Sequence, residues 1–413
     1  MYNVFKHTRT GRHSFLASFG PAWIVMIADV DVASIVTGIQ SGSSFGFHLI
    51  FIELMLTVPL AVIQFVSGSI AIATGKGIAE SIRGTWGSKY AYISAIPMAL
   101  TDFLSYVTEY AGIAIGFLLI GLNPAIGILT AFILHNVLVM TRRFETVEKP
   151  LLIISFVLVA SFVIAAVMSS PDLHSLVFTG LSPIQPYGNS DYTYLAVANI
   201  GAVIMPWMIF YQAGASVEKK IPATSIKGQK RETYMGALVS ELIMVAIIIA
   251  SARISSFGTL DLGDISGAFS YMGPMGHFLM AIGFISAAFL ALVVISLSSA
   301  WGVCEAAGIK FRFSEKISRR KGFYFIFLLE SFPAMILSMV ASSGLISLML
   351  NLMVIYVIVD IPVLIMVGMI TIKQRMVQRG TLSRKTMAAY WAFFFLIEAM
   401  GIYSLLTSSL AFL

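Results

Sequence analysis

Long runs of apolar residues alternate along the chain with short clusters of glycine, proline and charged residues. Eleven such runs can be distinguished, near 16–40, 46–74, 90–120, 123–140, 147–169, 194–217, 232–255, 273–304, 323–343, 345–371 and 386–411. An α-helix needs roughly 20 predominantly apolar residues to cross the hydrocarbon core of a membrane. The pattern therefore predicts an all-α, multi-pass membrane protein, in which residues 1–413 form one transmembrane domain of eleven helices.

Basic residues are concentrated in alternate connections between these runs. If the N-terminus lies in the cytoplasm, 25 of the 26 Lys and Arg residues fall on that side and only Arg253 falls outside. Cytoplasmic loops of membrane proteins are enriched in Lys and Arg, so we expect an internal N-terminus and an external C-terminus in the plasma membrane of a bacterium. The net charge of +6 then reflects topology and contact with the lipid bilayer, and predicts neither a nucleic-acid nor a protein partner.

The composition excludes several other classes of protein. Hydrophobic residues make up 58% of the chain and charged residues 11%, whereas soluble domains have roughly 45–50% and 25%. A soluble enzyme, a secreted disulfide scaffold and a nucleic-acid-binding domain are therefore excluded. Cys304 is the single cysteine, so neither an internal disulfide nor a cysteine metal cluster can form. No catalytic motif is visible, and we expect neither an enzyme nor a cofactor.

Two acidic residues lie in the middle of the first apolar run, which reads GPAWIVMIADVDVASIVTGIQSG. A carboxylate at the centre of a membrane costs roughly 2.5–3.5 kcal/mol on insertion scales, so Asp29 and Asp31 need partners or water. Residues at i and i+2 do not share one face of a helix. Either one carboxylate is structural and bonded to neighbouring helices, or the helix unwinds there and both face a cavity.

The sixth apolar run contains a second irregularity, in the sequence GAVIMPW. Pro206 removes one backbone hydrogen bond, which frees carbonyl groups near Ala202 to bind a cation, and Met205 offers a soft thioether ligand. A Met-Pro pair alone is more often a simple kink. Corresponding breaks in two halves of a membrane protein, however, indicate a transporter site at the midplane, and the polar 170–193 connection lies where two repeats would be joined.

Other acidic residues of the apolar runs have simpler interpretations. Glu53 lies near the outer end of the second run, where we expect water at the membrane interface to solvate it. Interhelical hydrogen bonding is the expected state of the remaining ones, which are Asp102, Glu241, Glu330 and Glu398. Asp102 could alternatively lie beside an ion path.

Several motifs resemble the NRAMP family of divalent-metal transporters. The match is close and free of gaps through PLAVIQFVSGSIAIATGKGIAESIRGTWG, and continues in GPA, TGIQSG, TEYAGIAIG and GAVIMPW. The resemblance extends over essentially the whole chain in segment order. It implies a leucine-transporter-type fold with five-plus-five inverted repeats at about 16–169 and 194–371, an extra helix at 386–411, and breaks in helices one and six.

The resemblance also implies a metal site between helices one and six. The family motif Asp-Pro-Gly-Asn falls on Asp31-Val32-Ala33-Ser34, so the metal-binding Asp is kept, Ser replaces Asn, and the Pro and Gly are absent. A polar residue of helix ten is replaced by an acid. The ligands carried over in this way, with the second acid of helix one added, are Asp31, Ser34, Ala28, Ala202, Met205, Asp360 and Asp29.

Residues of the family's proton route are altered in this chain. Trp207 and Gln212 stand at two positions that are His in the family, and Tyr106 stands at an acidic position. Glu109 stands at a position that is also acidic in the family, so this acid is retained. These departures imply that proton coupling is weakened or lost, with one acidic step remaining.

The implied function is secondary transport of a divalent cation by alternating access. Asp and Ser in place of amide ligands favour hard ions such as Mg²⁺, whereas a thioether favours Mn²⁺ or Fe²⁺, so both remain open. An alternative is transport of another small solute, such as an amino acid, on the same fold, although two acids at the break disfavour an anion. A sensor that kept the scaffold is a third interpretation, disfavoured because the sequence ends just after the last apolar run.

Overall fold

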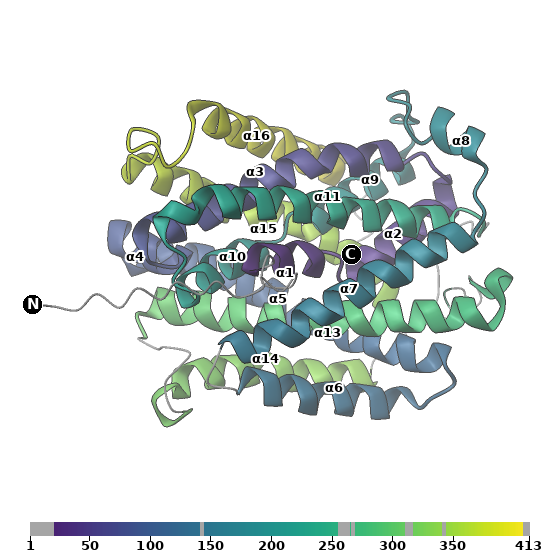
Figure 1. Ribbon diagram of the computed structural model, residues 1–413, viewed down its shortest axis with the longest axis horizontal. Coiled ribbons are helices and arrows are strands. Elements are labelled where there is room, and N and C mark those ends of the chain that lie inside the picture. Colours follow the sequence, from purple (N-terminus) through teal and green to yellow (C-terminus); the bar gives the residue numbers. More distant parts are fainter. Residues whose placement is uncertain are drawn as a thin grey trace, which may run out of the picture.

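The computed structural model describes residues 20–140, 144–254, 265, 269–309, 317–340 and 344–407. The basic N-terminal stretch with Lys6, Arg9 and Arg12 lies outside these residues. So do 16–19 of the first predicted helix and 408–411 of the last one. Helices make up nearly all of the described chain and run mainly along the long axis of the molecule (Figure 1).

Within the described residues, nine spans are long and apolar enough to cross a membrane. One of them consists of two consecutive helices, α9 (Ser190–Val203) and α10 (Pro206–Glu218). The other eight contain α3 (Ile50–Thr74), α5 (Ser88–Leu119), α7 (Phe144–Met168), α11 (Ile226–Ser251), α13 (Gly273–Ala307), α14 (Lys321–Val340), α15 (Leu345–Lys373) and α16 (Arg384–Thr407).

The first predicted helix is a broken pair, which adds a tenth span. α1 (Pro21–Ala28) and α2 (Val32–Phe45) are bent by 47° at the break. The fourth predicted run, near 123–140, forms α6 (Pro124–Val139), whose 16 residues extend only about 24 Å at 1.5 Å per residue. All eleven predicted runs are therefore helical, but α6 is shorter than the roughly 30 Å of a hydrocarbon core.

Two short helices were not predicted from the sequence. α4 (Ile78–Trp86) follows the second span, and α8 (Leu173–Phe178) lies in the connection predicted as an outer loop. α4 buries Ile78 and Ile82 while Arg83 points outward. Both helices are too short to give an apolar run of membrane length, so the hydropathy pattern does not reveal them.

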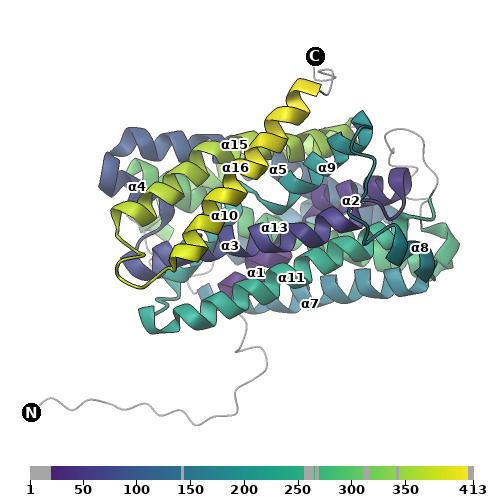
Figure 2. The ribbon, with the colours of Figure 1, turned by 90° about the horizontal axis from the view of Figure 1, so that it is seen from above.

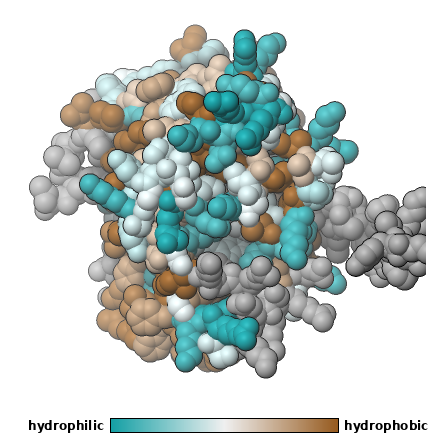
Figure 3. Space-filling view, turned by 90° about the vertical axis from the view of Figure 1, so that its left-hand side faces the viewer, coloured by the Kyte–Doolittle hydropathy of each residue, from teal (hydrophilic) through white to brown (hydrophobic). Residues whose placement is uncertain are grey.

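The broken helices lie inside the bundle and the most apolar surfaces lie outside it. Every residue of α1 is buried, and α1 packs against α7, α10, α11 and α13, whereas α2 packs against α9, α11 and α15 (Figures 1 and 2). α14 and α16 expose large apolar side chains such as Phe325 and Phe395. The end of the bundle that carries α4 is rich in hydrophilic residues (Figure 3). This arrangement suits a chain surrounded by lipid and wetted at its ends.

Candidate functional site

The break in the first span is capped by its own carboxylate. Asp31 is extended and precedes α2, and its Oδ1 atom accepts a hydrogen bond from the Ser34 N–H at 2.7 Å. The unpaired N–H groups and the dipole at a helix N-terminus stabilise such an acidic cap. The helix therefore unwinds here although the Pro and Gly of the resembling family are absent.

Glu109 of α5 stabilises the open turn. In a continuous helix the Val32 N–H would donate to the Ala28 carbonyl, but here it donates to Glu109 Oε2 at 3.3 Å. The Ala28 carbonyl thereby loses its helical donor. The Thr108 hydroxyl, which donates to the Ser105 carbonyl at 2.8 Å, lies 3.4 Å from the other oxygen of Glu109, and the Glu109 side chain is fully buried.

Asp29 is fixed between the break and α11. Its Oδ2 atom accepts a hydrogen bond from the Ser240 hydroxyl at 2.8 Å. Its backbone carbonyl accepts from the Asp31 N–H at 2.8 Å and from the Ser34 hydroxyl at 2.9 Å. Ser240 was not predicted as a site residue. Its signal in the sequence is weak, because it is simply a polar residue beside Glu241 within an apolar run.

The second break lies between α9 and α10. Met205 is extended, with φ −115° and ψ 140°, and Pro206 is the first residue of α10. Because Pro206 has no N–H, the Ala202 carbonyl lacks its usual helical donor. That carbonyl lies 3.4 Å from the Ser34 hydroxyl, which therefore joins the two breaks. A hydroxyl has one proton and two lone pairs, so Ser34 also retains acceptor capacity.

Several oxygen atoms at the breaks have no hydrogen-bond partner in the described chain and could bind a cation. Asp31 Oδ2 and Asp29 Oδ1 are buried and accept no hydrogen bond from the described residues. Among the residues that the structure describes, no three His, Cys, Asp or Glu side chains form a group that could hold a metal ion. A cation here would therefore use a mixed set of carboxylate, hydroxyl, carbonyl and thioether donors. The five members of that set, Ala28, Asp31, Ser34, Ala202 and Met205, are at most 1% exposed.

Asp360 lies on α15 and is buried, and neither of its carboxylate oxygens accepts a hydrogen bond from the described residues. Its charged neighbour is Glu398 of α16. No contact recorded for the described residues joins Asp360 to Asp31, so its role as a ligand stays a prediction.

The residues predicted for an altered proton route are all buried. Trp207 Nε1 and both polar side-chain atoms of Gln212 have no hydrogen-bond partner among the described residues. The Tyr106 hydroxyl donates to Ser296 at 2.8 Å, and His135 Nε2 lies 2.5 Å from the same serine oxygen. Tyr106 therefore belongs to a polar network that joins α5, α6 and α13.

The expectation for Glu53 is wrong. Its side chain is fully buried and lies close to Glu241 of α11, so the membrane interface does not solvate it. The expectation for Glu330 is confirmed, because its Oε1 atom accepts an interhelical hydrogen bond from Ser299 at 2.9 Å.

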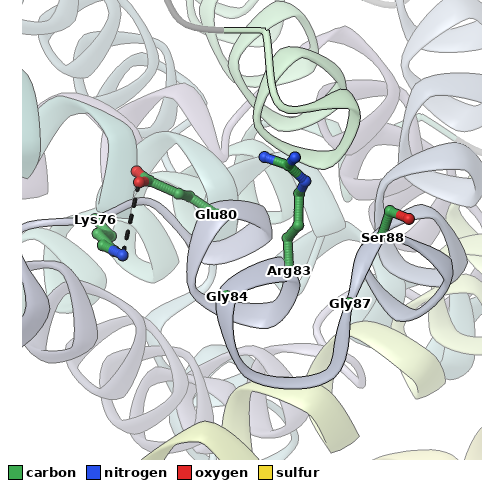
Figure 4. Close-up of a pocket in the computed structure, with 6 residues that line it drawn as sticks. All are labelled: Lys76, Glu80, Arg83, Gly84, Gly87 and Ser88. Atoms are coloured by element: carbon green, nitrogen blue, oxygen red, sulfur yellow. Dashed lines mark ion pairs between the residues drawn. The ribbon is translucent and has the colours of Figure 1, made fainter.

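A surface pocket of about 420 Å³ lies away from the breaks, around α4 (Figure 4). Lys76 and Glu80 form an exposed ion pair at its edge, 3.9 Å apart, and Arg83 reaches out from the next turn of α4. The remaining lining residues are Gly84, Gly87 and Ser88. Because its only acid is paired with a lysine and Arg83 adds positive charge, this pocket does not suit a metal cation.

These features define an integral, multi-pass membrane protein with two interrupted helices at its centre. The family described as Natural resistance-associated macrophage protein-like (Nramp) matches residues 22–407. The chain belongs to the Nramp family, which is a family of transporters and not of enzymes.

Individual relatives agree with this assignment. The divalent metal cation transporter MntH of Pectobacterium carotovorum subsp. carotovorum (strain PC1) is 29% identical over 301 residues, which cover 71% of each chain. A crystal structure of the Eremococcus coleocola manganese transporter, in complex with an aromatic bis-isothiourea substituted compound, has a TM-score of 0.72 at 16% identity, covering 95% of this chain and 88% of that chain. MhsT in complex with L-phenylalanine has a TM-score of 0.60 at 11% identity, covering 96% and 98%. The predicted leucine-transporter-type fold is thereby confirmed.

Proposed function

We propose that this Nramp protein carries a divalent metal cation across the membrane, and that the cation binds between the two helix breaks. The observation that supports this best is the free Oδ2 atom of Asp31, buried at a break whose neighbouring serine reaches the carbonyl of the other break. A buried carboxylate without a partner is costly, and a cation would offset that cost. The names of the Pectobacterium and Eremococcus proteins point to the same class of substrate.

The ligand set that we propose consists of the Asp31 carboxylate, the Ser34 hydroxyl, the carbonyls of Ala28 and Ala202, and the Met205 sulfur. Asp29 lies outside this set because Ser240 holds its carboxylate, and it contributes negative charge from close by.

We infer that the ion is of the Mn²⁺ or Fe²⁺ type rather than Mg²⁺. Mg²⁺ usually keeps several of its waters, whereas Asp31, Ser34 and Met205 are almost completely buried and favour an ion stripped of water. A thioether also favours a transition metal over Mg²⁺.

Proton coupling through α10 is weakened or absent in this proposal. Trp207 and Gln212 have no group that titrates near neutral pH, and the Tyr106 hydroxyl is bonded to Ser296. Transport would proceed by alternating access, with the N-terminus in the cytoplasm. Two carboxylates at the break disfavour the alternative of an anionic organic solute, because like charges repel.

Metal flux into proteoliposomes tests the proposal directly. We expect the wild-type protein to take up Mn²⁺ faster than Mg²⁺ at equal concentration, and Asp31→Ala to abolish the uptake. Asp191→Asn removes an exposed carboxylate at the start of α9 and should leave the flux unchanged. Full flux in Asp31→Ala, in protein that is folded by size-exclusion chromatography, would disprove the proposed site.

A further inference from the structure

A buried pair of carboxyl groups beside the first break takes no part in the proposed ligand set. Glu53 lies in the first turn of α3, and Glu241 lies in the middle part of α11. Both side chains are 0% exposed. The two helices pack against each other (Figure 1), which brings together residues nearly 190 positions apart in the sequence.

The contact between the two groups requires a proton. Their carboxyl groups lie close enough for a hydrogen bond to each other, and no N–H or O–H group of the described residues donates to any of their four oxygens. Ionised carboxylates only accept hydrogen bonds, so a bond between these two groups forms only when one of them carries the hydrogen. Two like charges in a low-dielectric interior also oppose ionisation of both groups. The contact between the two groups is therefore favourable when the pair holds one proton.

Ser240 of α11 and Asp29 of the break connect the pair of glutamates to the proposed metal site. Ser240, next to Glu241 on α11, donates to Asp29 Oδ2 at 2.8 Å. Asp29 interacts electrostatically with both Glu53 and Glu241, and its Oδ1 atom is buried without a partner among the described residues. Asp29 is the titratable group that faces the pair from the break, and no Lys, Arg or His of the described residues is a charged partner of either glutamate.

We propose that Glu53 and Glu241 form the proton site of this transporter, and that a divalent cation at the α1–α2 break displaces the proton. This rests on the proposed function. A doubly charged cation beside Asp29 and Asp31 stabilises nearby negative charge. The carboxyl O–H bond then breaks, the proton passes to water, and the pair keeps two negative charges. The linkage is reciprocal, so occupancy by the proton weakens binding of the metal.

Such a site would place proton linkage on α3 and α11, away from the positions of α10 where Trp207 and Gln212 stand. The transporter would then respond to pH without either histidine of the resembling family. The apparent metal affinity should fall as the pH falls, by up to about tenfold per pH unit for each linked proton.

Counting protons released on metal binding tests this inference. Purified protein in weakly buffered detergent is titrated with Mn²⁺ while a pH dye records proton release. We expect the double variant Glu53→Gln/Glu241→Gln to release about one proton fewer per bound Mn²⁺ than the wild type, and to show a shallower dependence of Mn²⁺ affinity on pH. The matched control is Glu330→Gln, which alters a buried carboxyl group bonded to Ser299 and should release as many protons as the wild type.

The outcomes separate the two proposals. Unchanged proton release in a double variant that still binds Mn²⁺ would overturn the proton site alone. Absence of Mn²⁺ binding to the wild type would overturn the proposed function and this inference with it. Infrared difference spectra do not depend on the double variant folding. Mn²⁺ should remove a protonated-carboxyl band from the wild type, and Glu241→Asp should shift that band. A band unaffected by Mn²⁺ or by Glu241→Asp would also overturn the inference.

Discussion

Ser34 is the residue on which the geometry of the metal site depends most directly. Its hydroxyl lies 2.9 Å from the Asp29 carbonyl and 3.4 Å from the Ala202 carbonyl. We expect Ser34→Ala to weaken Mn²⁺ binding about tenfold, which is roughly 1.4 kcal/mol, as measured by isothermal titration. Ser69→Ala removes a comparable buried hydroxyl, which donates to Phe65 within α3, and should leave affinity unchanged. Equal affinities in the two variants would rule out Ser34 as a ligand.

At the scale of single residues, the sequence locates the breaks but not their partners. Asp31 and Pro206 are conspicuous because a charge and an imino acid are unusual within apolar runs, and both lie where the helices are interrupted. The partners are different, because Ser240 and Glu109 reach the first break from other helices. Such contacts depend on how helices pack, and hydropathy carries no information about this. The error at Glu53 has the same cause.

The N-terminus of α2 depends on an acid from another helix. Glu109 accepts the Val32 N–H at 3.3 Å, and this donor has no helical partner. Glu109→Ala would leave a buried N–H unpaired, so we expect a loss of about 1–3 kcal/mol of stability. Glu109→Gln keeps an acceptor oxygen and should be at least as stable as the wild type. Thermal unfolding in detergent measures both, and an alanine variant as stable as the glutamine variant would contradict this role.

At the scale of elements, hydropathy predicts long buried helices well and short amphipathic ones poorly. Every predicted run is found as a helix, because burying about 20 residues in lipid imposes helical hydrogen bonding. α4 and α8 have nine and six residues. Because they also contain polar residues, neither helix forms an apolar run that hydropathy would detect. Asp29 and Asp31 left two alternatives open for the first span, a structural carboxylate or an unwound helix, and only the contacts with Ser34 and Glu109 decide that the chain unwinds.

At the scale of the whole molecule, the fold was predictable because motifs and topology agree. The partition of basic residues and the resemblance to the NRAMP family lead to the same number and order of helices. The boundaries of the two inverted repeats and the orientation in the membrane stay predictions. Orientation depends on insertion into a bilayer, which the fold of the chain alone does not determine.

One end of the molecule carries a set of polar contacts that holds α1 in place. Glu232 Oε1 of α11 accepts the Gly20 N–H at 2.6 Å and the Trp23 N–H at 2.8 Å, and so caps the N-terminus of α1. Beside it, Lys219 after α10 and Glu148 of α7 form an ion pair of 2.5 Å. Alternating access requires one end of the site to open. We expect this end to open by release of α1, because these contacts tie it to its neighbours.

Removing the cap should therefore shift the molecule toward the state that is open at this end. Hydrogen bonds to a charged acceptor contribute about 1.5–3 kcal/mol each, and a shift of 1.4 kcal/mol changes a population ratio about tenfold. We expect Glu232→Ala to increase labelling of Ala22→Cys by a membrane-impermeant maleimide at least about tenfold, in a Cys304→Ser background. Ala22 is 1% exposed in the closed arrangement.

The same labelling experiment measures the orientation of the molecule. Reagent added to the cytoplasmic face of oriented vesicles should label Ala22→Cys, and reagent on the other face should not. Lys76→Ala breaks an exposed ion pair at the same end, 3.9 Å long, and such pairs contribute little, so this variant should label at the wild-type rate. Equal labelling of Glu232→Ala and the wild type would mean that the cap does not restrain α1. Labelling from the external face alone would reverse the topology predicted from the basic residues.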